Sequence, residues 1–300
     1  MHTITDIQSQ EKTQCLTMMS MKMWYLLLLA AFLPIVPTVT EVVKSVSDCD
    51  QFLFEAKPPR VPGILEGGKI LNQTRYKVIC QTYKDERKFL TLYDTENKIP
   101  VFSALKYTGA KHKETSDIPW KIEPQLENGK DKNMCDVDQD KTYTNQAGDK
   151  DYRNNKRFDR GQLIRSSHGS QISDKNSTFT LTNIVPQAKS FNQKSWKRME
   201  KRAKHVVDDY CSDNNGVTEA YVVTGAIPND SNNKLNNRVN IPSKLWSAFC
   251  CYSPKVKILI TMAYWADNSP ETKYVPTNTL AELKQELGID VFPETKCPVS

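Results

Sequence analysis

The sequence predicts an α+β fold, in which many strands accompany few helices. Strand-like runs recur along the chain, two segments carry apolar residues at helical spacing, and no Gly/Ser linker or internal repeat divides residues 41–300. The 300 residues are 38% hydrophobic and 25% charged, which is the composition of an ordinary globular protein. We therefore expect a single domain over residues 41–300.

The clearest strand signal is a hairpin. Phe89–Tyr93 and Ile99–Leu105 are apolar or alternating, and the polar segment 94–98 between them is typical of a turn. Four further runs are predicted as strands for the same reason: Tyr76–Cys80, Thr178–Thr182, Ala220–Thr224 and Val256–Tyr264.

Two helices are predicted from periodicity and capping. One runs from about Asn192 to Asp208 and carries four apolar side chains at helical spacing, Trp196, Met199, Ala203 and Val207. The other starts at Thr279, where Glu282 completes a capping box, and stops at Gly288. The polar stretch from Leu126 to Lys156 is predicted as a long surface excursion. A calcium loop is the alternative there, but the glycine and distal glutamate of an EF-hand are missing.

Residues 1–40 are predicted to be an N-terminal extension and signal peptide that is removed. The mostly apolar run from Trp24 to Val39 follows Lys22, is interrupted by Pro34 and Pro37, and is shorter than the ~20 residues needed to cross a bilayer. An N-terminal membrane anchor is the alternative. We expect no integral membrane span in the remaining chain, and a secreted, extracellular protein.

Cysteines and acceptor triplets agree with secretion. Seven cysteines remain after residue 40, widely scattered and without a CxxC pair, so they predict disulfides rather than a zinc site. Their number is odd, so one thiol is left free or pairs with another chain, and the connectivity stays open. Three triplets match the glycosylation pattern and begin at Asn72, Asn176 and Asn229.

The segment from Phe158 to Glu200 carries the chemistry. It holds three blocks in order: Asp159-Arg160-Gly161-Gln162, then Thr182-Asn183-Ile184-Val185-Pro186-Gln187, then Asn192-Gln193-Lys194-Ser195-Trp196 with Glu200 four residues on. Asn192 begins the predicted helix and Glu200 lies two turns later, so both side chains can face one cleft.

These blocks resemble the pattern D-R-G-H, T-N-x-x-P-Q, N-Q-x-x-W-x-x-x-E of the DNA/RNA non-specific endonucleases of the ββα-metal (His-Me finger) type. The likeness is greatest to secreted vertebrate proteins that contain this domain, and it covers roughly Asp48 to Pro293. Earlier matches are Leu92–Thr95, Ile99–Ala104 and Trp120–Leu126. The resemblance implies a ββα-metal nuclease fold with a mixed, mainly antiparallel sheet.

The resemblance also implies the roles of the site residues. Asn192 would be the protein ligand of one divalent cation, Mg²⁺, while Glu200 and Asn183 would orient the water shell of the ion. Arg160 would contact phosphate and stabilise the charge of the transition state. Taken outside this pattern, Asn183 is an ordinary turn residue, Arg160 a surface salt bridge and Glu200 a solvated helix residue.

The chain departs from the family at Gln162, where the pattern has the histidine that takes a proton from the attacking water. A glutamine amide has no usable basicity near neutral pH, and loss of a positioned general base lowers a rate by about 10²–10⁴-fold. Many relatives also carry an arginine before the Trp120 block, which is absent here unless Lys111 or Lys113 substitutes.

Three histidines remain after residue 40. His168 follows Gln162 by six residues and is expected in an exposed loop, and His205 is expected on the outer face of the helix; the third is His112. Neither His168 nor His205 is predicted to replace the missing base.

The formal net charge of +6 suits a polyanionic partner. Basic residues crowd the first half of the helix and flank the Gln162 turn: Lys156, Arg157, Arg165, Lys189, Lys194, Lys197, Arg198, Lys201, Arg202 and Lys204. They predict contact with the phosphate backbone of DNA or RNA, although a solvated helix face accounts for about half of them. No residue set for reading bases is visible.

The predicted function is a secreted, metal-dependent, sugar-nonspecific endonuclease that hydrolyses phosphodiesters of DNA and RNA, weak or inactive because of Gln162. The alternative is an extracellular pseudoenzyme that binds nucleic acid or a protein. A structural secreted glycoprotein that uses the fold as a scaffold is a third reading. No oligomeric state is predicted.

Overall fold

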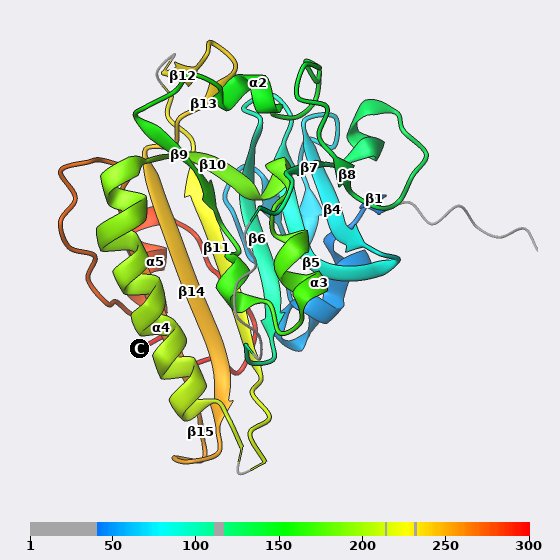
Figure 1. The fold of residues 1–300 in the computed structure, drawn as a ribbon. Coiled ribbons are helices and arrows are strands. Elements are labelled where there is room, and N and C mark those ends of the chain that lie inside the picture. Colours follow the sequence, from blue (N-terminus) through cyan, green and yellow to red (C-terminus); the bar gives the residue numbers. More distant parts are fainter. Residues whose placement is uncertain (1–40, 111–116, 214, 231–232) are drawn as a thin grey trace, which may run out of the picture. The chain divides into compact units, whose positions relative to one another are not determined.

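The computed structural model describes residues 41–110, 117–213, 215–230 and 233–300. Its centre is a seven-stranded sheet in the order β1-β4-β5-β6-β11-β14-β15, in which every neighbouring pair is antiparallel (Figure 1). The strands are β1 (Val42–Val43), β4 (Tyr76–Tyr83), β5 (Glu86–Asp94), β6 (Ile99–Tyr107), β11 (Ala220–Ile227), β14 (Lys244–Ser253) and β15 (Ile258–Asp267).

The predicted hairpin is confirmed as β5 and β6. Asp94 pairs with Ile99, and the Asp94 carboxylate accepts hydrogen bonds from the backbone N–H groups of Glu96 and Asn97, which closes the turn. The Arg75 guanidinium holds the same carboxylate through two contacts of 2.9 and 2.6 Å. The polar turn residues recognised in the sequence therefore set the register of the two central strands.

A hairpin and a helix cover one face of the sheet. They are β9 (Phe158–Gln162), β10 (Ile184–Ala188), the π-helical turn η6 (Phe191–Trp196) and the helix α4 (Lys197–Tyr210). The helix buries Met199, Ala203 and Val207, and the ring of Trp196 lies 5.1 Å from that of Tyr264 on β15. The predicted helix from Asn192 is thus confirmed, with its first turn wound as a π-helix.

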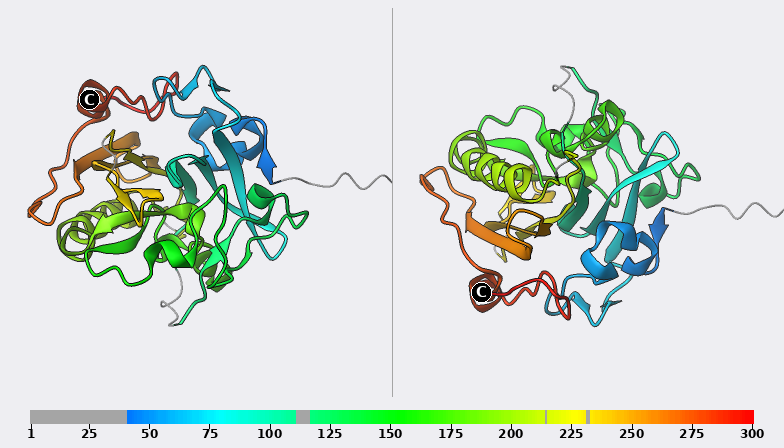
Figure 2. Two further views of the ribbon diagram at one scale, coloured as in Figure 1. Left: turned by 90° about the horizontal axis from the view of Figure 1, so that it is seen from above. Right: turned by 90° about the horizontal axis from the view of Figure 1, so that it is seen from below.

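The opposite face is covered by both ends of the described chain (Figure 2). The 3-10 helices η1 (Val46–Phe52) and η2 (Phe54–Ala56) pack there together with α5 (Leu280–Leu287). Helix α5 begins with the predicted capping box of Thr279 and Glu282 and ends at Gly288, whose φ of 71° is the left-handed value that glycine adopts without strain.

The remaining elements are short. The strand pairs are β2 (Leu65–Glu66) with β3 (Lys69–Ile70), β7 (Lys121–Ile122) with β8 (Cys135–Asp136), and β12 (Lys234–Leu235) with β13 (Val239–Asn240). The helical turns are η3 (Pro124–Glu127), α2 (Asp149–Tyr152), η4 (Ser166–His168), α3 (Ile172–Ser177) and η5 (Leu181–Asn183).

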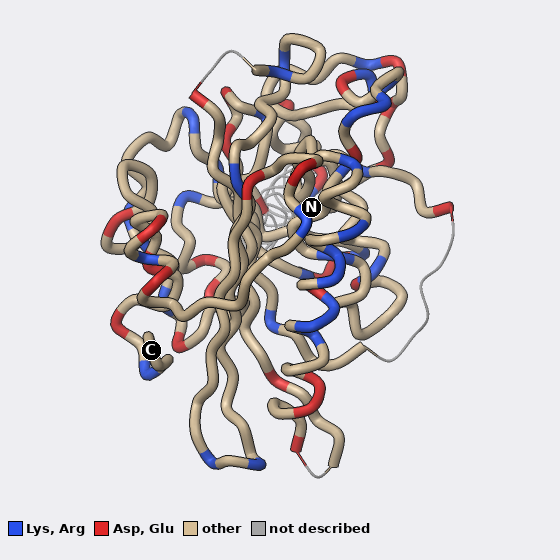
Figure 3. Tube along the Cα trace, turned by 90° about the vertical axis from the view of Figure 1, so that its left-hand side faces the viewer, with Lys and Arg blue, Asp and Glu red and all other residues tan. Residues whose placement is uncertain are grey.

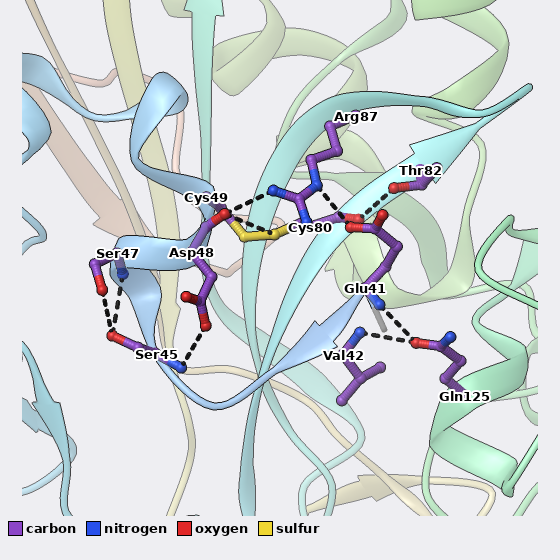
Figure 4. Close-up of a disulfide and its surroundings, with 10 residues drawn as sticks. All are labelled: Glu41, Val42, Ser45, Ser47, Asp48, Cys49, Cys80, Thr82, Arg87 and Gln125. Atoms are coloured by element: carbon purple, nitrogen blue, oxygen red, sulfur yellow. Dashed lines mark hydrogen bonds and ion pairs between the residues drawn. A yellow bond between two sulfur atoms is a disulfide. The ribbon is translucent and has the colours of Figure 1, made fainter. Parts of the chain in front are cut away.

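Three disulfides join Cys49 to Cys80, Cys211 to Cys251 and Cys250 to Cys297. The first ties η1 to strand β4, beside the ion pair of Arg87 with Glu41 (Figure 4). Among the described residues, Cys135 is the cysteine left free, and it is exposed. The predicted disulfides and odd thiol are therefore confirmed, and the structure supplies the connectivity.

Two local predictions are wrong. Thr178–Thr182 alternates like a strand but leads into the turn η5, because its threonine hydroxyls are satisfied inside the protein; Thr182 Oγ1, for example, accepts a 2.7 Å hydrogen bond from Gln81 Nε2. The stretch 126–156 is not purely a surface excursion, since Gln146 and Ala147 are fully buried. Gln146 exchanges hydrogen bonds with the backbone of Glu123, which draws this segment into the core.

The predicted signal peptide, with its membrane-anchor alternative, lies outside the described residues. Within the described part of the chain, no helix combines the length and apolar character needed to span a bilayer.

Candidate active site

The hairpin β9–β10 brings the first two motif blocks side by side. Gly161 pairs with Val185 and Asp159 with Gln187, in an unbroken antiparallel register. A Cβ atom on Gly161 would lie 2.3 Å from Gln187 Oε1 and 2.6 Å from Gln187 Cβ. The glycine of the first block is therefore required by the close approach of the glutamine that ends the second block.

Side chains on β9 alternate between two sides of the hairpin. Asp159 turns toward the start of the helix, where it contacts Asn192, whereas Arg160 turns toward the ring of Trp120. Gln162, two residues beyond Arg160, contacts Thr178. No contact joins Arg160 or Gln162 directly to Asn192 within the described residues, although Asp159 and Arg165, on either side of Gln162 in the chain, both reach it.

Asn192 lies in the π-helical turn η6 and is nearly buried. Its Nδ2 donates a 2.9 Å hydrogen bond to Asp159 Oδ2, and the exposed Gln193 donates to the same oxygen at 3.0 Å. Since Asp159 holds the amide nitrogen, the Asn192 carbonyl oxygen points to the other side. Wide turns of this kind interrupt α-helices most often at functional sites.

The Asn192 oxygen faces a guanidinium group. Arg165 Nη1 lies 3.4 Å from Asn192 Oδ1 and 2.6 Å from Glu200 Oε2. The Glu200 side chain is 7% exposed and that of Arg165 23%. Burial raises the pKa of Glu200 above its ordinary value, against the opposing effect of the Arg165 charge. The structure thus brings Asn192 and Glu200 together as predicted, with Arg165 between them.

Asn183 is fully buried and bonds to backbone. Its Oδ1 accepts from the Ile164 N–H at 3.1 Å, and its Nδ2 donates to the carbonyls of Ile164 at 2.8 Å and Thr178 at 3.0 Å. The predicted role in orienting metal-bound water has no contact to support it. Asn183 instead clamps the two residues that separate Gln162 from Arg165.

Gln162 is anchored through its nitrogen. Its Nε2 donates to the carbonyl oxygen of Thr178 at 3.0 Å and to Thr178 Oγ1 at 3.1 Å. Only the amide oxygen Oε1 is left to face a ligand, and this atom accepts hydrogen bonds but takes up no proton near neutral pH. The amide can orient a water molecule but cannot deprotonate it.

Arg160 is held by one carboxylate and two rings. Its Nη2 lies 2.6 Å from Asp149 Oδ1, and its guanidinium lies 5.4 Å from the ring centre of Trp120 and 5.6 Å from that of Tyr152. The Nε–H is buried and has no partner among the residues that the structure describes. This donor could bond to an oxygen of a bound phosphate. The contact of Arg160 with phosphate therefore stays a prediction.

His168 is not the exposed loop residue expected from the sequence. It is partly buried, and its ring packs edge-on against Tyr107 at 5.8 Å. Burial, helped by the charges of Arg165 and Lys204, lowers the pKa of His168 to about 4. The imidazole is therefore neutral but weakly basic. His205 is exposed as predicted, and His112 lies outside the described residues.

Positive charge gathers along the exposed side of α4 (Figure 3). Five basic residues of η6 and α4 have no ion-pair partner within the described chain: Lys194, Lys197, Arg198, Lys201 and Arg202. Lys204 differs, because it pairs with Asp208 one turn later. The basic face thus begins beside Asn192 and continues for two turns.

The sequence matches the profile of the DNA/RNA non-specific endonuclease family over residues 67–296, which is most of the chain. The chain belongs to this family. The match includes all three motif blocks and both strands of the β5–β6 hairpin, so the family expected from the resemblance is confirmed.

Two curated relatives are similar to this chain over much of the same part. The endonuclease domain-containing 1 protein of Homo sapiens is 28% identical over 218 residues, and that of Mus musculus is 27% identical over 215 residues. Each alignment covers 69% of this chain and 39% of the relative. The chain therefore spans well under half the length of these relatives.

The fold is that of the ββα-metal nucleases. A chain in the crystal structure of the EndoG/EndoGI complex superposes with a TM-score of 0.50 and 18% identity, over 72% of this chain and 87% of that one. The predicted α+β class and the ββα-metal arrangement of β9, β10 and α4 are confirmed.

Enzymes of the endonuclease family depend on a metal ion, and a divalent cation needs oxygen ligands that are free to face it. Asn192 Oδ1 and Glu200 Oε2, the two predicted partners, both face the Arg165 guanidinium. Two unit charges about 4 Å apart interact by about 4 kcal/mol at an effective dielectric constant of about 20, and a dication doubles that repulsion. The arrangement does not fit a divalent cation at Asn192.

The sequence does not single out two residues of the candidate site. Asp159 belongs to the first block, but the motif pattern assigns it no role. Arg165 is predicted only as one of the basic residues that flank Gln162. Both contact Asn192. The alternation of side chains along β9 could have indicated that Asp159 points away from Arg160 and Gln162. The contact of Arg165 with Asn192 could not be predicted in this way, because it depends on the path of the turn after Gln162. Lys111 and Lys113, the possible substitutes for the missing arginine, lie outside the described residues.

Proposed function

We propose that this chain is a secreted, sugar-nonspecific nucleic-acid-binding member of the endonuclease family whose hydrolysis of phosphodiesters is weak or absent. One observation carries the proposal. Gln162 occupies the place of the general base on β9, and its amide is tied by its nitrogen to Thr178. The surrounding ββα scaffold is intact, so the chain keeps the platform for binding but lacks the group that activates water.

Binding is supported by the basic face of α4 and by Arg160. The face presents a row of lysines and arginines without ion-pair partners in the described chain. The buried Nε–H of Arg160 is a further donor that no described residue uses. Such groups neutralise phosphates of any sequence and of either sugar. DNA and RNA should therefore bind with similar affinity.

Loss of hydrolysis is supported by the surroundings of His168, the described histidine nearest to Gln162 in the sequence. His168, six residues on, packs against Tyr107, and its pKa of about 4 gives it little basicity near neutral pH. The contact of Arg165 with Asn192 stands against the predicted Mg²⁺ ion at Asn192.

Secretion is supported by the three disulfides, which persist in oxidising compartments. Asn72, one of the three predicted glycosylation sites, is exposed. Treatment of the secreted protein with a glycosidase, followed by mass measurement, tests this part of the proposal.

The decisive test restores the base. In Gln162→His, the Thr178 carbonyl can accept a ring N–H, which leaves the other ring nitrogen free to take a proton. Plasmid and RNA cleavage by the purified variant should rise by about 10²-fold or more, the usual contribution of a general base. Gln162→Ala is the control and should stay at the level of the wild type.

Equal and substantial cleavage by the wild type and Gln162→His would show that Gln162 does not limit the reaction. Removal of His168 would then be the next step. No gain in a folded Gln162→His protein that still binds nucleic acid would favour the pseudoenzyme.

Binding is tested with fluorescent DNA and RNA oligonucleotides of unrelated sequence over a range of salt. The double variant Lys194→Ala/Lys197→Ala should weaken binding and lower the slope of log affinity against log salt by about 2, one for each lost phosphate contact. Lys255→Ala/Lys257→Ala, in the turn between β14 and β15, removes the same charge and should leave the slope unchanged. Absence of binding to either nucleic acid in low salt would instead favour a protein partner.

A further inference from the structure

Arg165 places a positive charge at the centre of the candidate site. One nitrogen, Nη1, lies 3.4 Å from Asn192 Oδ1 and 2.6 Å from Glu200 Oε2. These two oxygens come from the first turn of the helix and from two turns later, and they are the pair assigned to a divalent cation and its water shell by the family pattern. The guanidinium lies where the cation would have to lie.

The contact is held from three directions. Asp159 accepts a hydrogen bond from Asn192 Nδ2, which turns the Asn192 oxygen toward Arg165. Asn183 clamps the backbone of Ile164, the residue just before Arg165. The turn η4 then starts at Ser166 with a 3.0 Å bond from the His168 N–H to the Arg165 carbonyl. The guanidinium is therefore carried by an anchored segment.

The charges of Arg165 and Glu200 balance, but some N–H donors of the Arg165 guanidinium have no hydrogen-bond partner among the described residues. Glu200 provides one negative charge against the one positive charge of Arg165. Both side-chain contacts of Arg165 within the described residues use Nη1, so Nε and Nη2 remain, and the side chain is 23% exposed. A guanidinium presents its five N–H groups as a planar fork that matches phosphate oxygens.

We propose that Arg165 replaces the divalent cation of this site with a permanent organic cation, which binds a phosphodiester oxygen of the nucleic acid directly. The replacement of the metal goes beyond the proposed function. The phosphodiester contact, in contrast, rests on the proposed function, because it assumes that the chain binds nucleic acid.

The exclusion of metal is tested without nucleic acid, by titrating Mn²⁺ into the full mature chain and measuring free Mn²⁺ by electron paramagnetic resonance. The wild type should bind no stoichiometric Mn²⁺ in the low millimolar range. Arg165→Ala uncovers Asn192 and Glu200 and should gain one site, with at least tenfold higher affinity. The double variant Arg165→Ala/Asn192→Ala should lose that site again.

Arg238→Ala is the matched control. Arg238 is also partly exposed and ion-paired to a buried carboxylate, that of Asp151 at 2.7 Å. Its removal uncovers a carboxylate without an Asn192 beside it and should create no site of comparable affinity. Arg165→Lys keeps the charge and should continue to exclude Mn²⁺, which separates the effect of charge from that of a disturbed fold.

Stoichiometric Mn²⁺ binding by the wild type that Asn192→Ala abolishes would overturn the proposal. So would a folded Arg165→Ala protein that gains no site. If Arg165→Ala does not fold, the wild-type titration and Arg165→Lys decide the question by themselves.

The phosphodiester contact is tested with a single-stranded oligonucleotide in Mg²⁺ and then in excess chelator. Wild-type affinity should change less than twofold between the two buffers, and Arg165→Lys, which lacks the planar fork, should bind several-fold more weakly. A tenfold loss of wild-type affinity in chelator would overturn this part. Complete absence of binding in both buffers would refute the proposed function but leave the Mn²⁺ result standing.

Discussion

The two faces of the central sheet are covered in opposite ways. The face under β9, β10 and α4 buries amides and charged groups, among them Asn183, Asn192 and Glu200, beside its apolar residues. The face under η1 and α5 is packed mainly with aliphatic and aromatic side chains and carries the disulfides Cys49–Cys80 and Cys250–Cys297.

The two faces stabilise the fold in different ways. Apolar burial and cross-links stabilise without requiring one particular geometry at each contact. Buried polar groups stabilise only when every partner is in place, because an unsatisfied one costs about 1–3 kcal/mol. The α4 face still leaves some polar groups unsatisfied by the described part of the chain, since neither amide atom of Gln187 and not the Nε of Arg160 finds a partner there. Both residues belong to the nuclease motifs.

The largest effect is expected on the face under η1 and α5, which carries two of the three disulfides. Cys250→Ser/Cys297→Ser opens a bridge between residues 47 positions apart, and should lower the free energy of unfolding by about 4 kcal/mol because the unfolded chain gains entropy. Denaturant unfolding measures the change. Cys135→Ser removes a free, exposed thiol and is the control. A loss below about 1 kcal/mol would mean that apolar packing alone holds this face.

On the polar face, Asn183→Ala should lower the free energy of unfolding by about 3 kcal/mol, because three backbone partners lose their hydrogen bonds in a fully buried place. It should also loosen the segment carrying Arg165, seen as faster amide exchange at Leu163 and Ile164. Asn278→Ala, which removes a single 3.4 Å contact, is the control. Equal effects of the two substitutions would remove the distinction between the faces.

The smallest effect concerns pH. The folded pKa of His168, about 4, lies below its unfolded value of about 6.5. Its neutral form therefore contributes stability that is present above pH 6.5 and is lost as the pH falls toward 4. At pH 5 the loss is at most about 2 kcal/mol. His168→Gln, which does not titrate, should show a smaller fall in melting temperature between pH 7 and pH 5 than the wild type.

If the melting temperature of His168→Gln falls between pH 7 and pH 5 as much as that of the wild type, other groups of the polar face cause the acid sensitivity. His205→Gln is the matched control, because His205 is exposed on α4 and its loss should not alter the pH dependence.

Much of the fold could be predicted from local pattern. The β5–β6 hairpin, helix α4 and the capped helix α5 lie where periodicity, turn residues and the capping box predicted them. Strand β14 was not predicted, because it is buried on both faces of the sheet and so shows no alternation of polar and apolar residues. Thr178–Thr182 failed for the opposite reason, since its alternation reflects buried hydroxyl groups rather than a strand.

The sequence by itself determined the family, the three motif blocks and the absence of a histidine at Gln162, because these depend only on which residues occur and in what order. The tertiary structure decided which side chains meet. It paired six cysteines, turned Asn183 into a backbone clamp and placed Arg165 against Asn192 and Glu200. Such contacts join residues up to 47 positions apart, and their geometry is set by the path of the chain between them rather than by any local pattern.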